Sequence, residues 1–184
     1  REPFNVDGET FELAGLGPSG KGVRAVKSQK SVPEQPITDL TPGSPAASFE
    51  AVDLDGKARR LPGDYRGKVV LLDFWGVWCG WCVKEIPTIK KAYDRFHEKG
   101  FEVLGIDTDK DEATVRDFIR SKGVPWPQVY DTKTRALTSL YRVSSFPTLY
   151  LVDGDTGKII AKNEELRSGK LEPLLEDWMR KKGR

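Results

Sequence analysis

Two spacings of apolar residues alternate along the chain and predict strands and helices in turn. Residues 68–75 form an apolar run interrupted by Asp73, which is typical of a buried strand. From 83 to 96 the apolar residues recur every three or four positions, which is the spacing of a helix that buries one side. A second apolar run at 101–107 predicts another core strand, and 170–182 closes the chain with an amphipathic helix.

Shorter signals complete this pattern. Asp55-Gly56 predicts a tight hairpin turn, and Lys122-Gly123 predicts the end of a helix. Strands that alternate with helices predict an α/β fold with a central sheet covered by helices on both faces. The remaining predicted elements are a hairpin at 49–61, a helix near 114–119, an extended piece at 126–130, a short helix at 134–141 and a hairpin turn at 153–157.

The first 40 residues differ in composition from the rest. Glycine and proline interrupt a polar stretch there, so we expect residues 1–40 to be a partly extended linker or the remnant of an upstream region. Residues 41–184 then form one domain, which is the usual number for a chain of 184 residues. The chain starts at Arg1 without the pattern of a signal peptide, so we expect a mature or excised fragment.

Composition and charge narrow the possible functions. With 38% hydrophobic and 32% charged residues, the chain has the composition of a folded protein. A net charge of +2 gives no broad positive field, so we expect no nucleic-acid partner. The longest apolar stretch, 69–79, is far shorter than the roughly 18 to 20 residues that cross a bilayer, so we expect no membrane span in this chain. We also expect a monomer.

The sulfur chemistry is confined to one place. The chain has two cysteines, Cys79 and Cys82, and one histidine, His97, whereas a structural zinc site needs about four ligands. Covalent haem attachment requires histidine directly after the second cysteine, where this chain has Val83. We therefore expect neither a metal nor a bound cofactor. Two interpretations of the cysteines remain: a dithiol that cycles to a disulfide, and an inert pair.

The position of the pair favours the redox interpretation. Cys79 falls between the predicted strand 68–75 and the helix that follows it. Unpaired N–H groups and the helix dipole favour a thiolate there and can bring a cysteine pKa down to ~7 or lower. We therefore expect Cys79 to be the exposed nucleophile. Cys82 lies one turn inside the helix, placed to face inward and attack a mixed disulfide on Cys79, so it is the predicted resolving thiol.

Residues 73–82, Asp-Phe-Trp-Gly-Val-Trp-Cys-Gly-Trp-Cys, resemble the active-site segment of the thioredoxin superfamily. The resemblance implies a thioredoxin-like fold and a thiol–disulfide oxidoreductase. Two positions depart from the family pattern: Gly76 replaces an alanine, and Trp81 replaces the proline of thioredoxin itself. Because the residues between the cysteines tune the redox potential, an uncharged Gly-Trp pair implies a less oxidising protein than the strongly oxidising members.

The same resemblance implies roles for three further residues. Asp73 stands where thioredoxins carry a buried acid behind the second cysteine, and would accept a proton during exchange. The alternative is an acid that only hydrogen-bonds its surroundings. Pro147 looks like the cis-proline that faces the cysteines, with an ordinary turn proline as the alternative. The backbone of Phe146 would then pair with an extended substrate segment beside Cys79.

Within the superfamily the chain is similar to the TlpA-type, AhpC/TSA-related branch. The similarity rests on the hairpin before the redox strand, on Glu85 and Pro87, and on an inserted strand-helix segment before Pro147. It covers about residues 41–182. It implies an extracytoplasmic protein, periplasmic or tethered to the envelope through a missing N-terminal part. Such a protein acts on cysteine-containing protein substrates with an upstream electron donor or acceptor.

These observations lead to one functional hypothesis with two rivals. The hypothesis is an enzyme that exchanges disulfides with proteins through Cys79 and Cys82. Trp78 and Trp81 are candidate docking residues around the sulfur atoms, and the alternative is that Trp78 only packs against the start of the helix. One rival is a thiol peroxidase, whose family pattern has threonine at the position of Gly76. The other is a non-catalytic binding module that senses redox state.

Overall fold

The structure is a computed structural model that describes residues 4–6, 9–13, 25–27, 39–131 and 135–183. The chain divides into two units, Arg1–Pro36 and Ile37–Arg184. In the first unit the described residues form a three-stranded antiparallel sheet in the order β1-β2-β3. Its strands are β1 (Phe4–Val6), β2 (Glu9–Leu13) and β3 (Ala25–Lys27). The interpretation of residues 1–40 as a linker or remnant stays a prediction.

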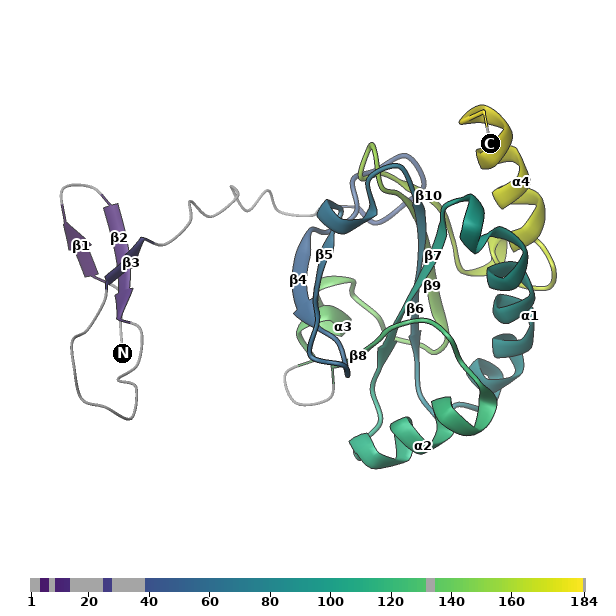
Figure 1. The fold of residues 1–184 in the computed structure, drawn as a ribbon, viewed down its shortest axis with the longest axis horizontal. Coiled ribbons are helices and arrows are strands. Elements are labelled where there is room, and N and C mark those ends of the chain that lie inside the picture. The colour runs from purple at the N-terminus through teal and green to yellow at the C-terminus, as the bar shows by residue number, and fades with distance from the viewer. Residues whose placement is uncertain (1–3, 7–8, 14–24, 28–38, 132–134, 184) are drawn as a thin grey trace. The chain divides into compact units, whose positions relative to one another are not determined.

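The second unit contains a five-stranded mixed sheet in the order β10-β9-β6-β7-β8 (Figure 1). Strand β6 lies at the centre with all seven residues buried, parallel to β7 and antiparallel to β9. This confirms the buried strand predicted from the apolar run and places Asp73 inside it. The strands are β6 (Val69–Trp75), β7 (Phe101–Asp107), β8 (Gln128–Tyr130), β9 (Thr148–Asp153) and β10 (Ile159–Lys162).

Both faces of this sheet are covered, as the alternation of strands and helices predicts (Figure 1). Side chains alternate along a strand, so β6 contributes to two apolar clusters. Leu71 and Trp75 pack with the helices α1, α2 and α4, whereas Leu72 and Phe74 pack with α3 and the hairpin β4–β5. The covering elements are α1 (Gly80–Phe96), α2 (Glu112–Lys122), α4 (Leu171–Lys181), α3 (Ala136–Leu140), β4 (Phe49–Val52) and β5 (Ala58–Leu61).

The ends of the helices follow local sequence signals. Helix α1 continues into a short 3-10 helix, η2 (His97–Lys99), which ends at Gly100 in the left-handed conformation with φ 101°. The side chain of Asp111 caps the start of α2 by accepting from the N–H groups of Ala113 and Thr114. The helix predicted at 134–141 forms over Ala136–Leu140, and residue 134 lies outside the described residues.

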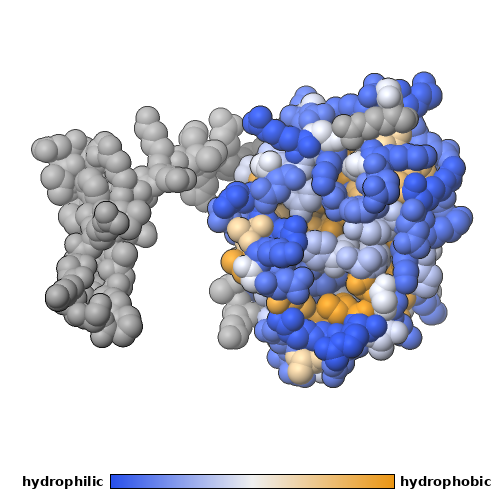
Figure 2. Space-filling view, in the orientation of Figure 1, coloured by the Kyte–Doolittle hydropathy of each residue, from blue (hydrophilic) through white to orange (hydrophobic). Residues whose placement is uncertain are grey.

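The surface of the second unit is mostly polar. Figure 2 shows hydrophilic residues over most of the visible face, with smaller apolar patches between them. Among the described residues, the large hydrophobic side chains that are exposed are Val52, Trp78 and Trp81. No helix in the described part of the chain is long and apolar enough to cross a membrane.

Candidate active site

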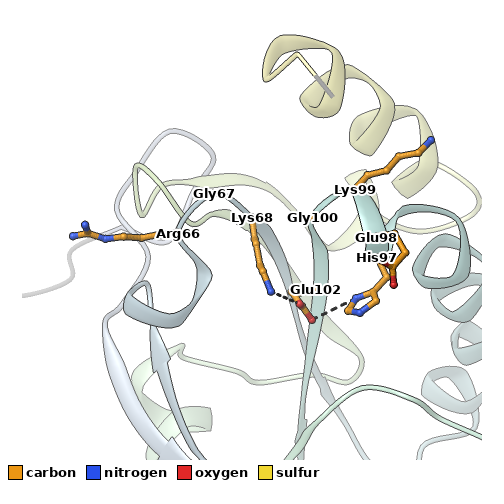
Figure 3. Close-up of a pocket in the computed structure, with 8 residues that line it drawn as sticks. All are labelled: Arg66, Gly67, Lys68, His97, Glu98, Lys99, Gly100 and Glu102. Carbon is orange, nitrogen blue, oxygen red and sulfur yellow. Dashed lines mark hydrogen bonds and ion pairs between the residues drawn. The ribbon is translucent and has the colours of Figure 1, made fainter.

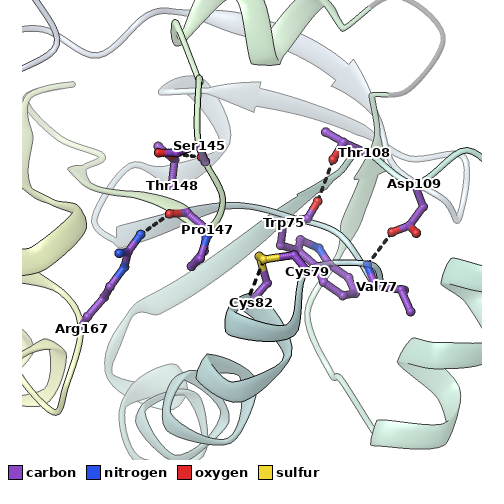
Figure 4. The surroundings of a disulfide bond; sticks show 10 residues. All are labelled: Trp75, Val77, Cys79, Cys82, Thr108, Asp109, Ser145, Pro147, Thr148 and Arg167. Atoms are coloured by element: carbon purple, nitrogen blue, oxygen red, sulfur yellow. Dashed lines mark hydrogen bonds between the residues drawn. A yellow bond between two sulfur atoms is a disulfide. The ribbon is translucent and has the colours of Figure 1, made fainter.

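The two cysteines form a disulfide at the start of helix α1 (Figure 4). Cys79 is the residue that caps α1, and its sulfur accepts a hydrogen bond of 3.2 Å from the backbone N–H of Cys82. This is the strand-to-helix junction that the sequence predicts. The first N–H groups of a helix and its dipole favour negative charge, so the junction favours a thiolate at Cys79 once the disulfide is reduced.

Both cysteines are buried in this oxidised form. Cys79 is 6% exposed and Cys82 is 3% exposed. The expectation of an exposed Cys79 is therefore wrong for the disulfide form. The reason is packing, because the two sulfurs belong to the apolar cluster around α1, and Val77 and Phe146 pack against the same cluster.

Asp73 lies on the face of β6 that α1 covers. It shares this face with Leu71 and Trp75, because alternate residues of a strand point to the same side. The side chain is 4% exposed. Burial raises the pKa of Asp73 to about 7, the negative charge of Glu85 adds to the rise, and the positive charge of Arg167 opposes it. A carboxyl with this pKa can both accept and release a proton near neutral pH.

The loop before β9 lies beside the disulfide (Figure 4). Its Phe146–Pro147 peptide bond is cis, as the resemblance to thioredoxins implied. The hydroxyl of Thr148 donates to the carbonyl of Ser145 at 2.7 Å, and Arg167 donates to the carbonyl of Pro147. These two bonds fix the backbone of the loop on both sides of Pro147.

A second group of buried acids supports the loop that leads to Cys79. The backbone N–H of Val77 donates to the carboxylate of Asp109 at 2.6 Å, and Asp109 N–H donates to the carboxyl of Asp107 at 2.9 Å. Thr108 bonds the carbonyl of Trp75 through its hydroxyl at 3.1 Å. Burial, together with the Asp109 carboxyl, raises the pKa of Asp107. The sequence pattern did not point to this group, and the available signal was the pair Asp107 and Asp109 at the end of the apolar run 101–107.

Two exposed tryptophans flank the disulfide. Trp78 is 59% exposed and Trp81 is 72% exposed. The Trp78 ring meets Phe146 edge to face with centroids 5.2 Å apart, and Lys84 lies 4.6 Å above the centre of the Trp81 ring. A Cβ atom at Gly76 would lie 2.3 Å from Nε1 of Trp78. The space for a side chain at position 76, where the peroxidase pattern has threonine, is therefore occupied by Trp78.

A separate cavity of about 660 Å³ lies at the other end of β6 (Figure 3). The carboxylate oxygens of Glu102 lie 2.6 Å from Nζ of Lys68 and 3.7 Å from Nδ1 of His97 there. The left-handed turn at Gly100 brings β7 back beside the end of α1, which places Glu102 next to His97. The cavity is lined by Arg66, Gly67, Lys68, His97, Glu98, Lys99, Gly100 and Glu102. The described residues contain no cluster that could hold a metal ion.

The AhpC/TSA family model matches residues 42–162 of the chain. The chain belongs to the AhpC/TSA family. Curated relatives include the thiol-disulfide oxidoreductase ResA of Bacillus anthracis, 34% identical over 139 residues, which cover 76% of this chain and 77% of the relative. ResA of Bacillus subtilis is 34% identical over 140 residues, which cover 76% of this chain and 75% of that relative.

Solved structures agree with this assignment of the AhpC/TSA protein. The thioredoxin domain of a thiol-disulfide oxidoreductase from Bacteroides vulgatus matches with a TM-score of 0.68 and 36% identity, over 77% of this chain and 99% of that domain. A thiol:disulfide interchange protein from Bacteroides sp. matches with a TM-score of 0.67 and 37% identity, over 77% of this chain and 91% of that protein's chain. The protein is thus a TlpA/ResA-type thiol–disulfide oxidoreductase with a thioredoxin-like fold, in which the hairpin β4–β5 precedes the redox strand β6 and the segment β8–α3 precedes the cis-proline.

Proposed function

We propose that this oxidoreductase exchanges disulfides with cysteine-containing protein substrates through Cys79 and Cys82. The observation that carries the proposal is the arrangement of three features around one disulfide: the start of helix α1, the cis-proline loop and a buried acid (Figure 4). In this proposal Cys79 is the nucleophile, Cys82 is the resolving thiol and Asp73 moves the proton. The backbone at Phe146 and Pro147 positions the substrate.

In the reducing direction the reaction has two steps. The thiolate of Cys79 attacks a substrate disulfide, forms a mixed disulfide and releases one substrate sulfur as a thiolate. Cys82 then loses its proton to Asp73 and attacks the sulfur of Cys79, which releases the second substrate sulfur. Asp73 passes the Cys82 proton to one departing substrate thiolate, and solvent protonates the other. The substrate therefore gains two electrons and two protons, and the enzyme ends in the disulfide form seen in this structure.

An upstream dithiol partner must then reduce the Cys79–Cys82 disulfide, or an oxidant must form it if the flow is reversed. We propose that the domain at 41–184 acts as a monomer in an extracytoplasmic compartment, periplasmic or tethered to the envelope. In this proposal residues 1–40 are a linker or the remnant of an upstream region. The support is the similarity to ResA proteins and to a structure named as a thiol:disulfide interchange protein DsbE from Chlorobium tepidum, 26% identical with a TM-score of 0.65.

Exposed Trp78 and Trp81 are proposed to form the apolar rim on which the protein substrate docks. Exposed aromatic side chains beside a reactive group are typical of interaction sites, because they bury large apolar areas on contact. The Trp78–Phe146 contact links this rim to the cis-proline loop. A substrate segment could therefore contact both at once.

The test is turnover and trapping with insulin as the substrate and a small dithiol as the reductant. We expect catalysed insulin reduction by the wild-type chain, and a stable mixed disulfide with Cys82→Ser that is absent with Cys79→Ser. A redox sensor would give no turnover. A peroxidase would consume hydrogen peroxide faster than it reduces insulin, and either result would contradict the proposed function.

A further inference from the structure

One side chain beside the disulfide has no role in the mechanism above. Arg167 follows the short 3-10 helix η3 (Asn163–Glu165) and lies close to Pro147 in Figure 4. Its guanidinium donates to the carbonyl of Pro147 and pairs with Glu164 at 2.7 Å. The Arg167 side chain is 22% exposed, whereas Glu164 is 79% exposed. The hydrogen bond from Arg167 to Pro147 is therefore less exposed to solvent than the ion pair between Arg167 and Glu164.

Stability alone does not account for this placement. The Nε–H group of Arg167 is buried and has no hydrogen-bond partner in the part of the chain that the structure describes. A buried donor without an acceptor costs stability, and the exposed pair with Glu164 contributes little. What the position does provide is a permanent positive charge and a planar fork of donors beside the active site.

The loop that Arg167 holds is the one proposed to bind substrate. Pro147 has no backbone N–H, so its carbonyl is the polar group through which the loop can be held at that residue. Once the Pro147 carbonyl is fixed, the backbone at Phe146 is held ready for an extended segment and does not have to be ordered on binding.

The charge of Arg167 also acts on the buried acid. The charged groups that act on Asp73 are Glu85 on α1 and Arg167 after η3, and Asp73 in turn raises the pKa of Asp107 on β7. Of these groups only Arg167 is positive. It lowers the pKa of Asp73 from the value that burial and Glu85 would otherwise give.

We propose that Arg167 is a positioning residue of the active site, which holds the carbonyl of Pro147 and whose positive charge acts on the buried Asp73. This inference rests on the proposed roles of Asp73 and the cis-proline loop. Two separate consequences follow. Loss of the guanidinium donors of Arg167 impairs the binding of extended substrates. Loss of the positive charge moves proton transfer to Asp73 to higher pH.

The experiment compares Arg167→Gln, which removes both charge and fork, with Arg167→Lys, which keeps the charge. Glu164→Gln is the matched control, because it removes the exposed ion pair and leaves the Pro147 contact in place. For Arg167→Gln we expect KM for insulin to rise about tenfold, the loss typical of a charged hydrogen bond. The rate with a small aromatic disulfide, which does not need the loop, should change far less.

The pH profile of mixed-disulfide resolution is the second readout. Its midpoint should move to higher pH in Arg167→Gln and stay in place in Arg167→Lys. In an Asp73→Asn background, Arg167→Gln should still raise KM for insulin. It should no longer move the midpoint of the pH profile. Glu164→Gln should behave as wild type in both assays.

The outcomes separate the inference from the function on which it rests. If wild type reduces insulin and Arg167→Gln matches it in KM and pH profile, the inference is wrong and the proposed function stands. A shift of the midpoint that persists without Asp73 would also refute the inference. If wild type itself does not exchange disulfides, both fall.

Discussion

The buried carboxyl of Asp73 should make the stability of the folded protein depend on pH in a specific way. Its pKa is about 7 in the folded protein against an ordinary value of 3.8. Below about pH 4 the group is protonated in both the folded and the unfolded chain and has no effect. Between about pH 4 and pH 7 the unfolded chain releases this proton while the folded chain keeps it, so folding is progressively penalised. Above the pKa that Asp73 has in the folded protein, the full loss of folding stability remains.

The magnitude follows from the difference of about three pKa units. Each unit corresponds to 1.36 kcal/mol, so the penalty at about pH 8 is roughly 4 kcal/mol. Asp73→Asn keeps the size of the side chain and abolishes the titration. The variant also buries a new amide, which changes the free energy of unfolding by the same amount at every pH. Only the difference between two pH values therefore reports the carboxyl.

The assay is urea unfolding of the oxidised protein at about pH 4 and about pH 8. We expect Asp73→Asn to gain stability relative to wild type between the two values, by up to roughly 4 kcal/mol. Asp117→Asn, which removes an exposed carboxylate on α2, controls for the general change in charge. If the difference between Asp73→Asn and wild type is the same at both pH values, Asp73 does not have the raised pKa on which its proposed role depends.

Three other substitutions test separate parts of the site. Asp109→Ala leaves the N–H of Val77 without its acceptor, so we expect a loss of ~1–3 kcal/mol in urea unfolding and slower attack on insulin. Gly76→Thr must displace the Trp78 ring, so it should cost ~1–3 kcal/mol and bring no peroxide turnover in a peroxide-consumption assay. Trp81→Ala should leave the free energy of unfolding within ~0.5 kcal/mol, because the side chain is 72% exposed, while KM for insulin rises and KM for a small disulfide does not.

The features of the site that depend on local sequence pattern could be predicted from the sequence. Strand β6 and helix α1 follow from the spacing of apolar residues, and their junction places Cys79 at the helix start. The resemblance to thioredoxins then pointed to Asp73 and Pro147, which the structure shows buried and cis respectively. Each of these assignments uses residues that are near in sequence or belong to a motif.

The features that sequence analysis missed depend on contacts between distant segments. Asp109 reaches Val77 because β7 runs parallel to β6, and Arg167 reaches Pro147 across 20 residues of chain. No spacing or composition rule pairs such residues. The burial of Cys79 was missed for the same reason, since Phe146 covers the same cluster from a loop far along the chain.

The chemical identity of the nucleophile is the central claim, and alkylation of the reduced protein tests it most directly. The dithiol form is treated with iodoacetamide between about pH 5 and pH 10, and mass spectrometry locates the label. We expect Cys79 to react first, with a rate that reaches half its maximum below pH ~8.5, the pKa of free cysteine. Labelling of Cys82 before Cys79, or a Cys79 that reacts only as fast as free cysteine at each pH, would contradict the account.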